Sequence, residues 1–113
     1  EIAQMLSQLK WIKYIRMSCD TDNMLVIVQD AIRQLGKVGV KPYRIFVYLL
    51  VQDIESAERR ALALRDMGAE VFAQPYRDFI TSREPPHELK RFARWVNRKE
   101  IFKTTNYFKD YRG

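Results

Sequence analysis

The apolar residues of this chain follow two alternating periodicities, and the alternation is repeated three times. Residues 14–20, 43–51 and 70–76 form short runs rich in branched and aromatic residues, which is typical of β-strands. Each run is followed by a segment whose apolar residues recur at helical spacing, and one more helical pattern covers residues 2–9. Repeated strand–helix units predict an α/β fold with parallel strands. We expect three consecutive βα units, preceded by one helix, that form part of a larger sheet or barrel.

The helical segments carry recognisable start signals. Residues 21–23 offer N-cap side chains for the first helix and Asp53 offers one for the second. The third helix is predicted to open at the two prolines, residues 85–86, because proline is tolerated in a first turn. The tail, residues 100–113, is rich in aromatic residues and is expected to pack back on the body.

The first two strands differ in the polarity of their faces. In the first strand one face is apolar and the other polar: Ile15, Met17 and Cys19 against Arg16, Ser18 and Asp20. Ordinary buried parallel strands are apolar on both faces, so the polar face must line a wet cavity or an exposed edge. The second strand, residues 45–51, is apolar on both faces and is predicted to be fully buried.

Polar residues gather where the first and third strands end, in residues 18–22 and 74–78. Parallel sheets carry their chemistry at the carboxyl ends of the strands. Short polar side chains there suit sugar hydroxyls and a purine edge, and a Tyr76 ring could stack. An equally weighted interpretation is structural: Asp20 and Asp22 would cap a helix, and Arg77 and Asp78 would form an ion pair within a loop.

Composition narrows the classes of function. The chain has 113 residues, a net charge of +6 and one cysteine. A single cysteine excludes an internal disulfide and fits a reducing compartment, and Cys19 is expected to be a buried, inert thiol. The only histidine, His87, is expected to lie on the surface. Neither a dinucleotide-binding nor a P-loop glycine motif is present, and no apolar run is long enough for a membrane helix.

Several segments together resemble a known family. They are residues 14–21, residues 44–51 with 53–58, residues 72–79 and residues 92–97. These segments are similar to the carboxyl-terminal half of a radical S-adenosylmethionine enzyme. The resemblance implies half of a partial (β/α)6 barrel of the TIM-like kind, with the chain as a single segment. It also implies a [4Fe–4S] cluster, held by a C-x-x-x-C-x-x-C loop, that cleaves S-adenosylmethionine reductively to a 5′-deoxyadenosyl radical, which abstracts a substrate hydrogen.

This chain has no such three-cysteine loop, so it would hold only the last three βα units and be inactive by itself. No catalytic residue and no metal ligand is expected in it, and it would hold neither the cluster nor the cofactor alone. The resemblance assigns cofactor contacts to the ends of the first and third strands: Ser18 and Asp20 to the ribose, and Gln74, Pro75 and Tyr76 to the adenine. It assigns substrate contacts more loosely: Arg16, Tyr48, Arg77 and Asp78.

The expected partners follow from this interpretation. The missing amino-terminal half of the barrel would be the main one, and an exposed sheet edge would allow a homodimer. We expect a cytoplasmic location and no membrane association. The alternative hypothesis is a small independent α/β binding module that recognises nucleic acid through its basic surface, densest at residues 90–99. Half of another barrel enzyme ranks last, because the glycine-rich phosphate loop usual in such barrels is missing.

Overall fold

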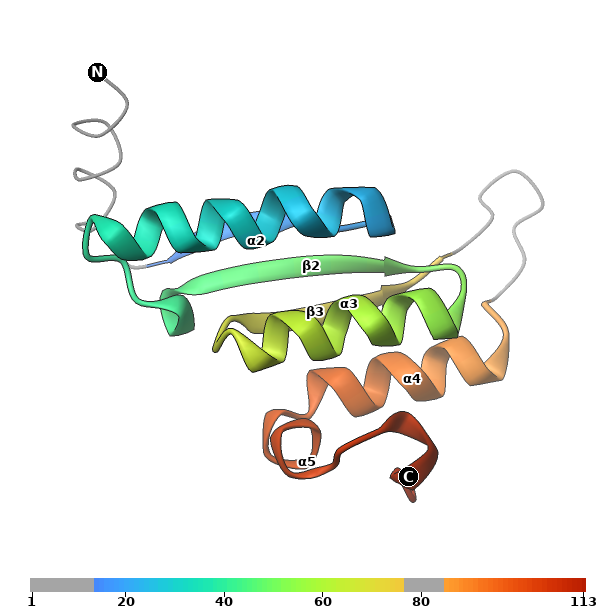
Figure 1. Ribbon diagram of the computed structural model, residues 1–113. Coiled ribbons are helices and arrows are strands. Elements are labelled where there is room, and N and C mark those ends of the chain that lie inside the picture. Colours follow the sequence, from blue (N-terminus) through green and yellow to red (C-terminus); the bar gives the residue numbers. More distant parts are fainter. Residues whose placement is uncertain (1–13, 77–84) are drawn as a thin grey trace.

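The structure is a computed structural model that describes residues 14–76 and 85–113 (Figure 1). Strands and helices alternate along the chain, which confirms the predicted α/β class and its consecutive βα units. The elements are β1 (Ile15–Ser18), α2 (Asp22–Lys37), β2 (Ile45–Val51), α3 (Ile54–Asp66), β3 (Glu70–Pro75), α4 (His87–Asn97) and α5 (Lys99–Thr104). Short 3-10 turns cover Pro42–Arg44 and Phe108–Asp110. The helix predicted over residues 2–9 lies outside the described residues.

The described strands form one open parallel sheet in the order β1-β2-β3, which is also their order in the chain. Figure 1 shows α2, α3 and α4 on the same side of this sheet. Both features have one cause, since right-handed crossovers that always add the next strand in the same direction place every helix on one face. A doubly wound sheet would reverse direction and cover both faces.

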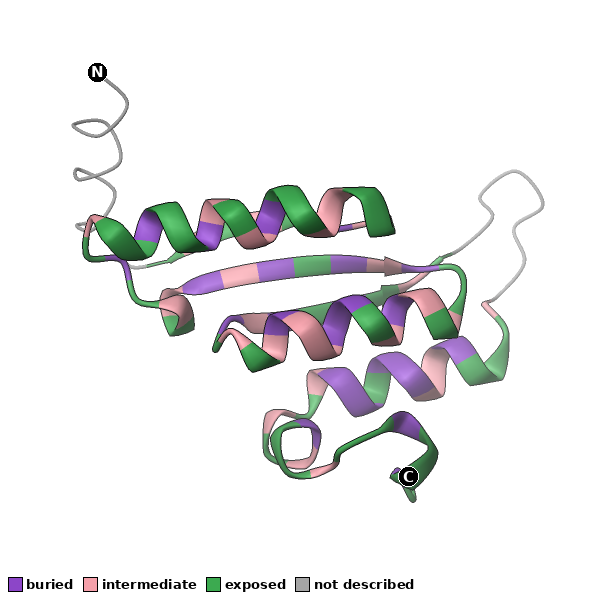
Figure 2. Ribbon diagram, viewed as in Figure 1, coloured by how far each residue is buried: buried purple, intermediate pink, exposed green. Residues whose placement is uncertain are grey.

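The core lies between the sheet and its helices. Every second residue of β2 faces the helices and is almost completely buried: Ile45, Val47, Leu49 and Val51. The predicted stripe of α2 is buried at Val28, Ile32 and Leu35, and small residues of α3, Ala57 and Ala61, let that helix approach the sheet closely. Figure 2 shows these buried positions as bands along the strands and helices.

No helix of the described residues covers the opposite face of the sheet. The prediction that β2 is buried on both faces is wrong for the described structure. Phe46, Tyr48 and Leu50 point away from the helices, where Tyr48 is exposed and Phe46 and Leu50 are only half-buried. Tyr48 is 39% exposed, and its ring lies 5.9 Å from that of Phe72, which is 44% exposed. We call this surface the open face. Apolar composition alone could not distinguish one covered face from two.

The carboxyl-terminal tail packs back on the body, as predicted. Phe102, Phe108 and Tyr111 are buried. Phe102 and Phe108 place their rings 5.0 and 5.6 Å from that of Trp95, a fully buried residue of α4. The aromatic residues of the tail therefore close the core beyond α4.

No helix among the described residues is long and apolar enough to cross a membrane. That agrees with the absence of a long apolar run in the sequence.

Two glycines offer a matched test of this backbone. Gly68 follows α3 with φ +89°, and an added Cβ would lie 3.3 Å from Pro42 Cβ. Gly36 lies near the end of α2 with open space around its Cα. We expect Gly68→Ala to lower the free energy of unfolding by about 1–2 kcal/mol, and Gly36→Ala to raise it by up to about 1 kcal/mol. Urea unfolding measures both, and equal effects would contradict the described turn after α3.

Candidate functional site

A small hollow lies on the open face at the carboxyl ends of the strands. Its volume is about 190 Å³, and it is lined by Ser18, Asp20, Tyr48, Leu49, Leu50 and Gln74. The sheet register creates it, since Ser18 pairs with Tyr48 and Leu50 pairs with Gln74. The structure thus brings together four residues to which the sequence analysis assigned cofactor or substrate contacts: Ser18, Asp20, Tyr48 and Gln74. We call this the strand-end hollow.

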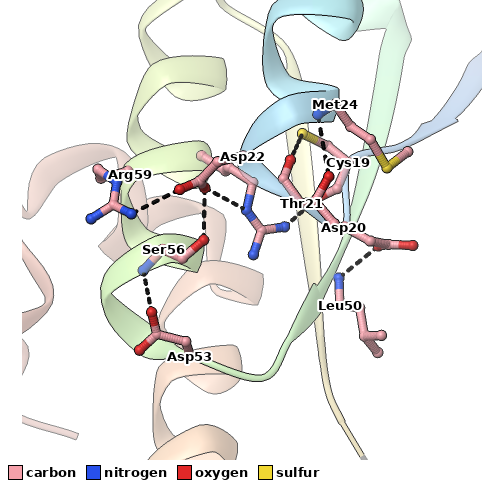
Figure 3. Close-up of polar contacts among 10 residues, drawn as sticks. Cys19, Asp20, Thr21, Asp22, Met24, Leu50, Asp53, Ser56 and Arg59 are labelled. Atoms are coloured by element: carbon pink, nitrogen blue, oxygen red, sulfur yellow. Dashed lines mark hydrogen bonds and ion pairs between the residues drawn. The ribbon is translucent and has the colours of Figure 1, made fainter.

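Asp20 extends the pairing of β1 with β2. The Cys19 N–H donates to the carbonyl of Tyr48 at 2.8 Å, and beyond this point the Asp20 carboxylate replaces a backbone acceptor. Its Oδ1 accepts from the Leu50 N–H at 3.0 Å (Figure 3). Within the described residues this is the only hydrogen bond to the Asp20 carboxylate. One carboxylate oxygen is therefore structural, and the other can still accept from a ligand.

The remaining nominated residues lie elsewhere or are not described. Arg16 is on the open face, but one row further from the strand ends, where it pairs with Phe46. Pro75 and Tyr76 follow Gln74 without lining the strand-end hollow. Residues 77 and 78, the nominated Arg77 and Asp78, lie outside the described part of the chain.

A second hollow of about 320 Å³ lies where α2 and α3 begin. We call it the helix-end hollow, and Asp20 lines both hollows. The other residues that line it are Thr21, Asp22, Asn23, Gln52, Asp53, Ser56 and Arg60. All of these residues are of polar or charged types, and three of them, Asp20, Asp22 and Asp53, carry carboxylates.

The caps of the two helices explain part of this polarity. Thr21 caps α2, because its Oγ1 accepts from the Met24 N–H at 3.3 Å, and Asp53 caps α3 by accepting from the Ser56 N–H at 3.2 Å. The prediction for Asp53 is confirmed. The interpretation that Asp20 and Asp22 are caps is wrong, because Asp20 bonds to β2 and Asp22 faces α3 instead.

Asp22 links the beginnings of the two helices. It accepts from Ser56 Oγ at 2.7 Å and from Arg59 at 2.8 Å, as Figure 3 shows. The hydrogen bonds from Arg59 and Ser56 lower the pKa of the Asp22 carboxyl. Asp22 thus stays ionised and ties α2 to α3 at the rim of the helix-end hollow.

Arg60 is a site residue that the sequence interpretation missed. Its side chain is buried, with the residue 2% exposed, and it donates to the carbonyl of Cys19. Its Nε lies 3.4 Å from Asp22 Oδ1, so the buried charge is paired. A signal was present, because Arg60 falls between Ala57 and Ala61 on the apolar stripe of α3.

Cys19 is confirmed as a buried thiol, with no exposed surface. Burial raises its pKa, and the nearby charge of Arg60 only partly offsets that effect. Burial and a raised pKa both disfavour the thiolate, which is the reactive form of cysteine. Among the described residues no group of three or more histidine, cysteine or acidic side chains is arranged to hold a metal ion.

Several cations of the basic surface bond to backbone carbonyls of their own chain. Arg65 donates to the carbonyls of Phe102 and Thr105, each at 2.7 Å. Arg91 donates to the Tyr111 carbonyl at 2.5 Å, and Lys99 donates to the Val71 carbonyl. Burial lowers the pKa of Lys99. These cations organise the tail and the sheet edge, so the stretch at residues 90–99 is not simply a surface for phosphates.

Comparisons with known protein families, with curated proteins and with solved structures found no match to this chain.

The buried arginine and its exposed neighbour form a matched pair of variants, since both contact Asp22. We expect Arg60→Met to lower the free energy of unfolding by about 1–3 kcal/mol, because the buried Cys19 carbonyl loses its donor. Arg59→Met should have a clearly smaller effect, because exposed ion pairs contribute little. Urea unfolding of both variants measures the difference. Equal losses would show that Arg60 does not hold the end of β1.

The lowered pKa of Asp22 predicts that the free energy of unfolding depends on pH. Its pKa is lower in the folded protein than in the unfolded chain, so the unfolded state binds more protons as the pH falls. Its stabilising effect is complete above the ordinary aspartate pKa of about 3.9 and is lost as the pH falls through the lower folded value. The stability difference between the natural protein and Asp22→Asn should therefore shrink on acidification. A difference that is constant from pH 6 to pH 2 would contradict this account.

Proposed function

We propose that this chain is the carboxyl-terminal half of a radical S-adenosylmethionine barrel, part of an iron–sulfur oxidoreductase. In this proposal the strand-end hollow receives the nucleoside part of the cofactor. Ser18 and Asp20 contact the ribose, and Gln74, Pro75 and Tyr76 lie toward the adenine. The residues assigned to substrate contacts are Arg16, Tyr48, Arg77 and Asp78.

The winding of the sheet supports the barrel. Strands in chain order, with α2, α3 and α4 on one face, are what a barrel wall has: its helices lie outside and the other face of its sheet lines the interior. The open face then becomes the barrel interior. Its exposed aromatic and polar side chains, which an isolated sheet leaves in water, would face the bound molecules.

The strand-end hollow is the observation that carries the proposal. It combines the hydroxyl of Ser18, the carboxylate of Asp20 and the amide of Gln74. One oxygen of that carboxylate accepts from the Leu50 N–H, and the other accepts no hydrogen bond from the described residues. These groups suit sugar hydroxyls and the edge of a purine. At about 190 Å³ the hollow is smaller than a typical ligand pocket of about 300–1,000 Å³. It would therefore hold part of the cofactor, and other strands would supply the remaining contacts.

The iron–sulfur cluster does not fit this chain. A [4Fe–4S] cluster is held by several cysteine thiolates, whereas this chain has one cysteine and that thiol is buried. The cluster ligands would belong to the amino-terminal half, so this segment is not catalytic by itself. The proposal includes a cytoplasmic location, which the single unpaired, buried thiol favours.

The alternative hypothesis is an independent module that binds nucleic acid. It has less support, because Arg65, Arg91 and Lys99 donate to backbone carbonyls of their own chain. Exposed cations remain, among them Arg94 and Arg98. A steep loss of RNA or DNA affinity with added salt would favour this alternative.

Asp20 allows the cofactor role to be tested separately from its structural role. An asparagine side chain at this position keeps an acceptor for the Leu50 N–H, whereas an alanine side chain does not. In the protein translated from the complete reading frame, reconstituted without oxygen, we expect Asp20→Asn to weaken S-adenosylmethionine binding about 10- to 100-fold. Its melting temperature should stay nearly unchanged, and Asp20→Ala should lose both affinity and stability.

Asp30→Asn is the matched control, since Asp30 is an exposed residue of α2 outside both hollows. Binding and reductive cleavage of S-adenosylmethionine by the natural protein support the proposal. A reconstituted protein that does neither would overturn it, and an Asp20→Asn protein with full affinity would remove Asp20 from the cofactor site.

A further inference from the structure

The two edges of the sheet are built differently. In a strand, the N–H and C=O of one residue point to the same side, and successive residues point to opposite sides. Since the Tyr76 N–H donates to the Val51 carbonyl, the outer edge of β3 is formed by Val71, Ala73 and Pro75. This edge would attract another strand unless it were blocked.

Side chains of the chain itself block the edge of β3. Asn97 Oδ1 accepts from the Ala73 N–H at 2.8 Å, and Asn97 Nδ2 donates to the Ala73 carbonyl at 2.9 Å. One amide side chain thus occupies the donor and the acceptor that a neighbouring strand would use. Lys99 donates to the Val71 carbonyl, and Pro75 has no N–H to offer. We call this the sealed edge.

Among the described residues, no such seal protects β1. The Cys19 N–H points to β2, so the backbone groups of Arg16 and Ser18 point outward. Within residues 14–76 and 85–113, β2 is the only strand paired with β1, and no side chain hydrogen-bonds to these outward groups. β1 contains no proline, and no described side chain caps its edge as Asn97 caps that of β3.

We infer that the outer edge of β1 pairs with a parallel strand from the portion of the same polypeptide that precedes β1, and that β3 is the last strand of the sheet. This inference rests on the proposed function and names the partner surface it requires. The described chain adds strands in one direction only, from β1 to β3. Asn97 and Lys99, which follow β3 in the chain, occupy its outer edge. A further strand can therefore be added only next to β1. A preceding strand joined by a right-handed crossover is parallel and keeps its helix on the covered face.

Amide hydrogen exchange tests this inference without any cofactor chemistry. The protein translated from the complete reading frame is compared with the 113-residue chain. We expect the Arg16 and Ser18 amides to exchange at least about tenfold more slowly in the longer protein, independently of protein concentration. The Ala73 amide should be protected in both.

Two variants test each edge separately. Asn97→Ala should speed exchange at Ala73 at least about tenfold in both proteins, whereas Asn106→Ala, at an exposed residue of the tail, should not. Ser18→Pro removes one outward N–H without removing a bond to β2. It should lower the melting temperature of the longer protein more than that of the 113-residue chain.

Unprotected Arg16 and Ser18 amides in the longer protein would overturn the inference. Protection that rises with protein concentration would also overturn it, because a second copy would then occupy the edge. An unchanged Ala73 rate in Asn97→Ala would show that β3 is not sealed. These results are separate from S-adenosylmethionine cleavage, which tests the proposed function: a longer protein can fail either test and pass the other.

Discussion

The structure depends on the burial of one face of a parallel sheet beneath its own helices. Parallel strands need long crossovers, and here each crossover is a helix that returns to the same side. Ile45, Val47, Leu49 and Val51 give β2 a completely apolar side for this contact. The same constraint leaves the other side without a helix among the described residues. It also places the carboxyl ends of β1, β2 and β3 at one edge, where both hollows lie.

The polar contacts at that edge hold the strand ends in place. Asp20 continues the pairing with β2, and Arg60 reaches from α3 beneath the sheet to the carbonyl of Cys19. Asp22 joins the first turns of α2 and α3. The residues proposed to bind a cofactor are therefore attached to rigid elements on several sides, which is how a binding site keeps its geometry.

Much of this fold was predictable from the sequence, because it follows from local periodicity. The strand runs, the stripe of α2 and the Asp53 cap depend on residues close together in the chain, and the structure agrees with them. The open side of β2 was not predictable, since the sequence cannot say which layers cover a strand.

Arg60 and Asn97 were missed for a similar reason. Their partners, Cys19 and Ala73, lie 41 and 24 residues away, and only the folded chain brings them together. The gathering of Ser18, Asp20 and Gln74 agrees with the expectation that parallel strand ends share an edge, while their role toward a cofactor stays a prediction.

The central claim is that this chain is the back half of a barrel whose front half carries an iron–sulfur cluster. The most direct measurement is the sequence of the complete reading frame upstream of Glu1. The account predicts a C-x-x-x-C-x-x-C motif about a hundred residues before Tyr14, the distance that three further βα units require. A start codon immediately before Glu1 would contradict it, because the chain has a single cysteine and no cluster could then be bound.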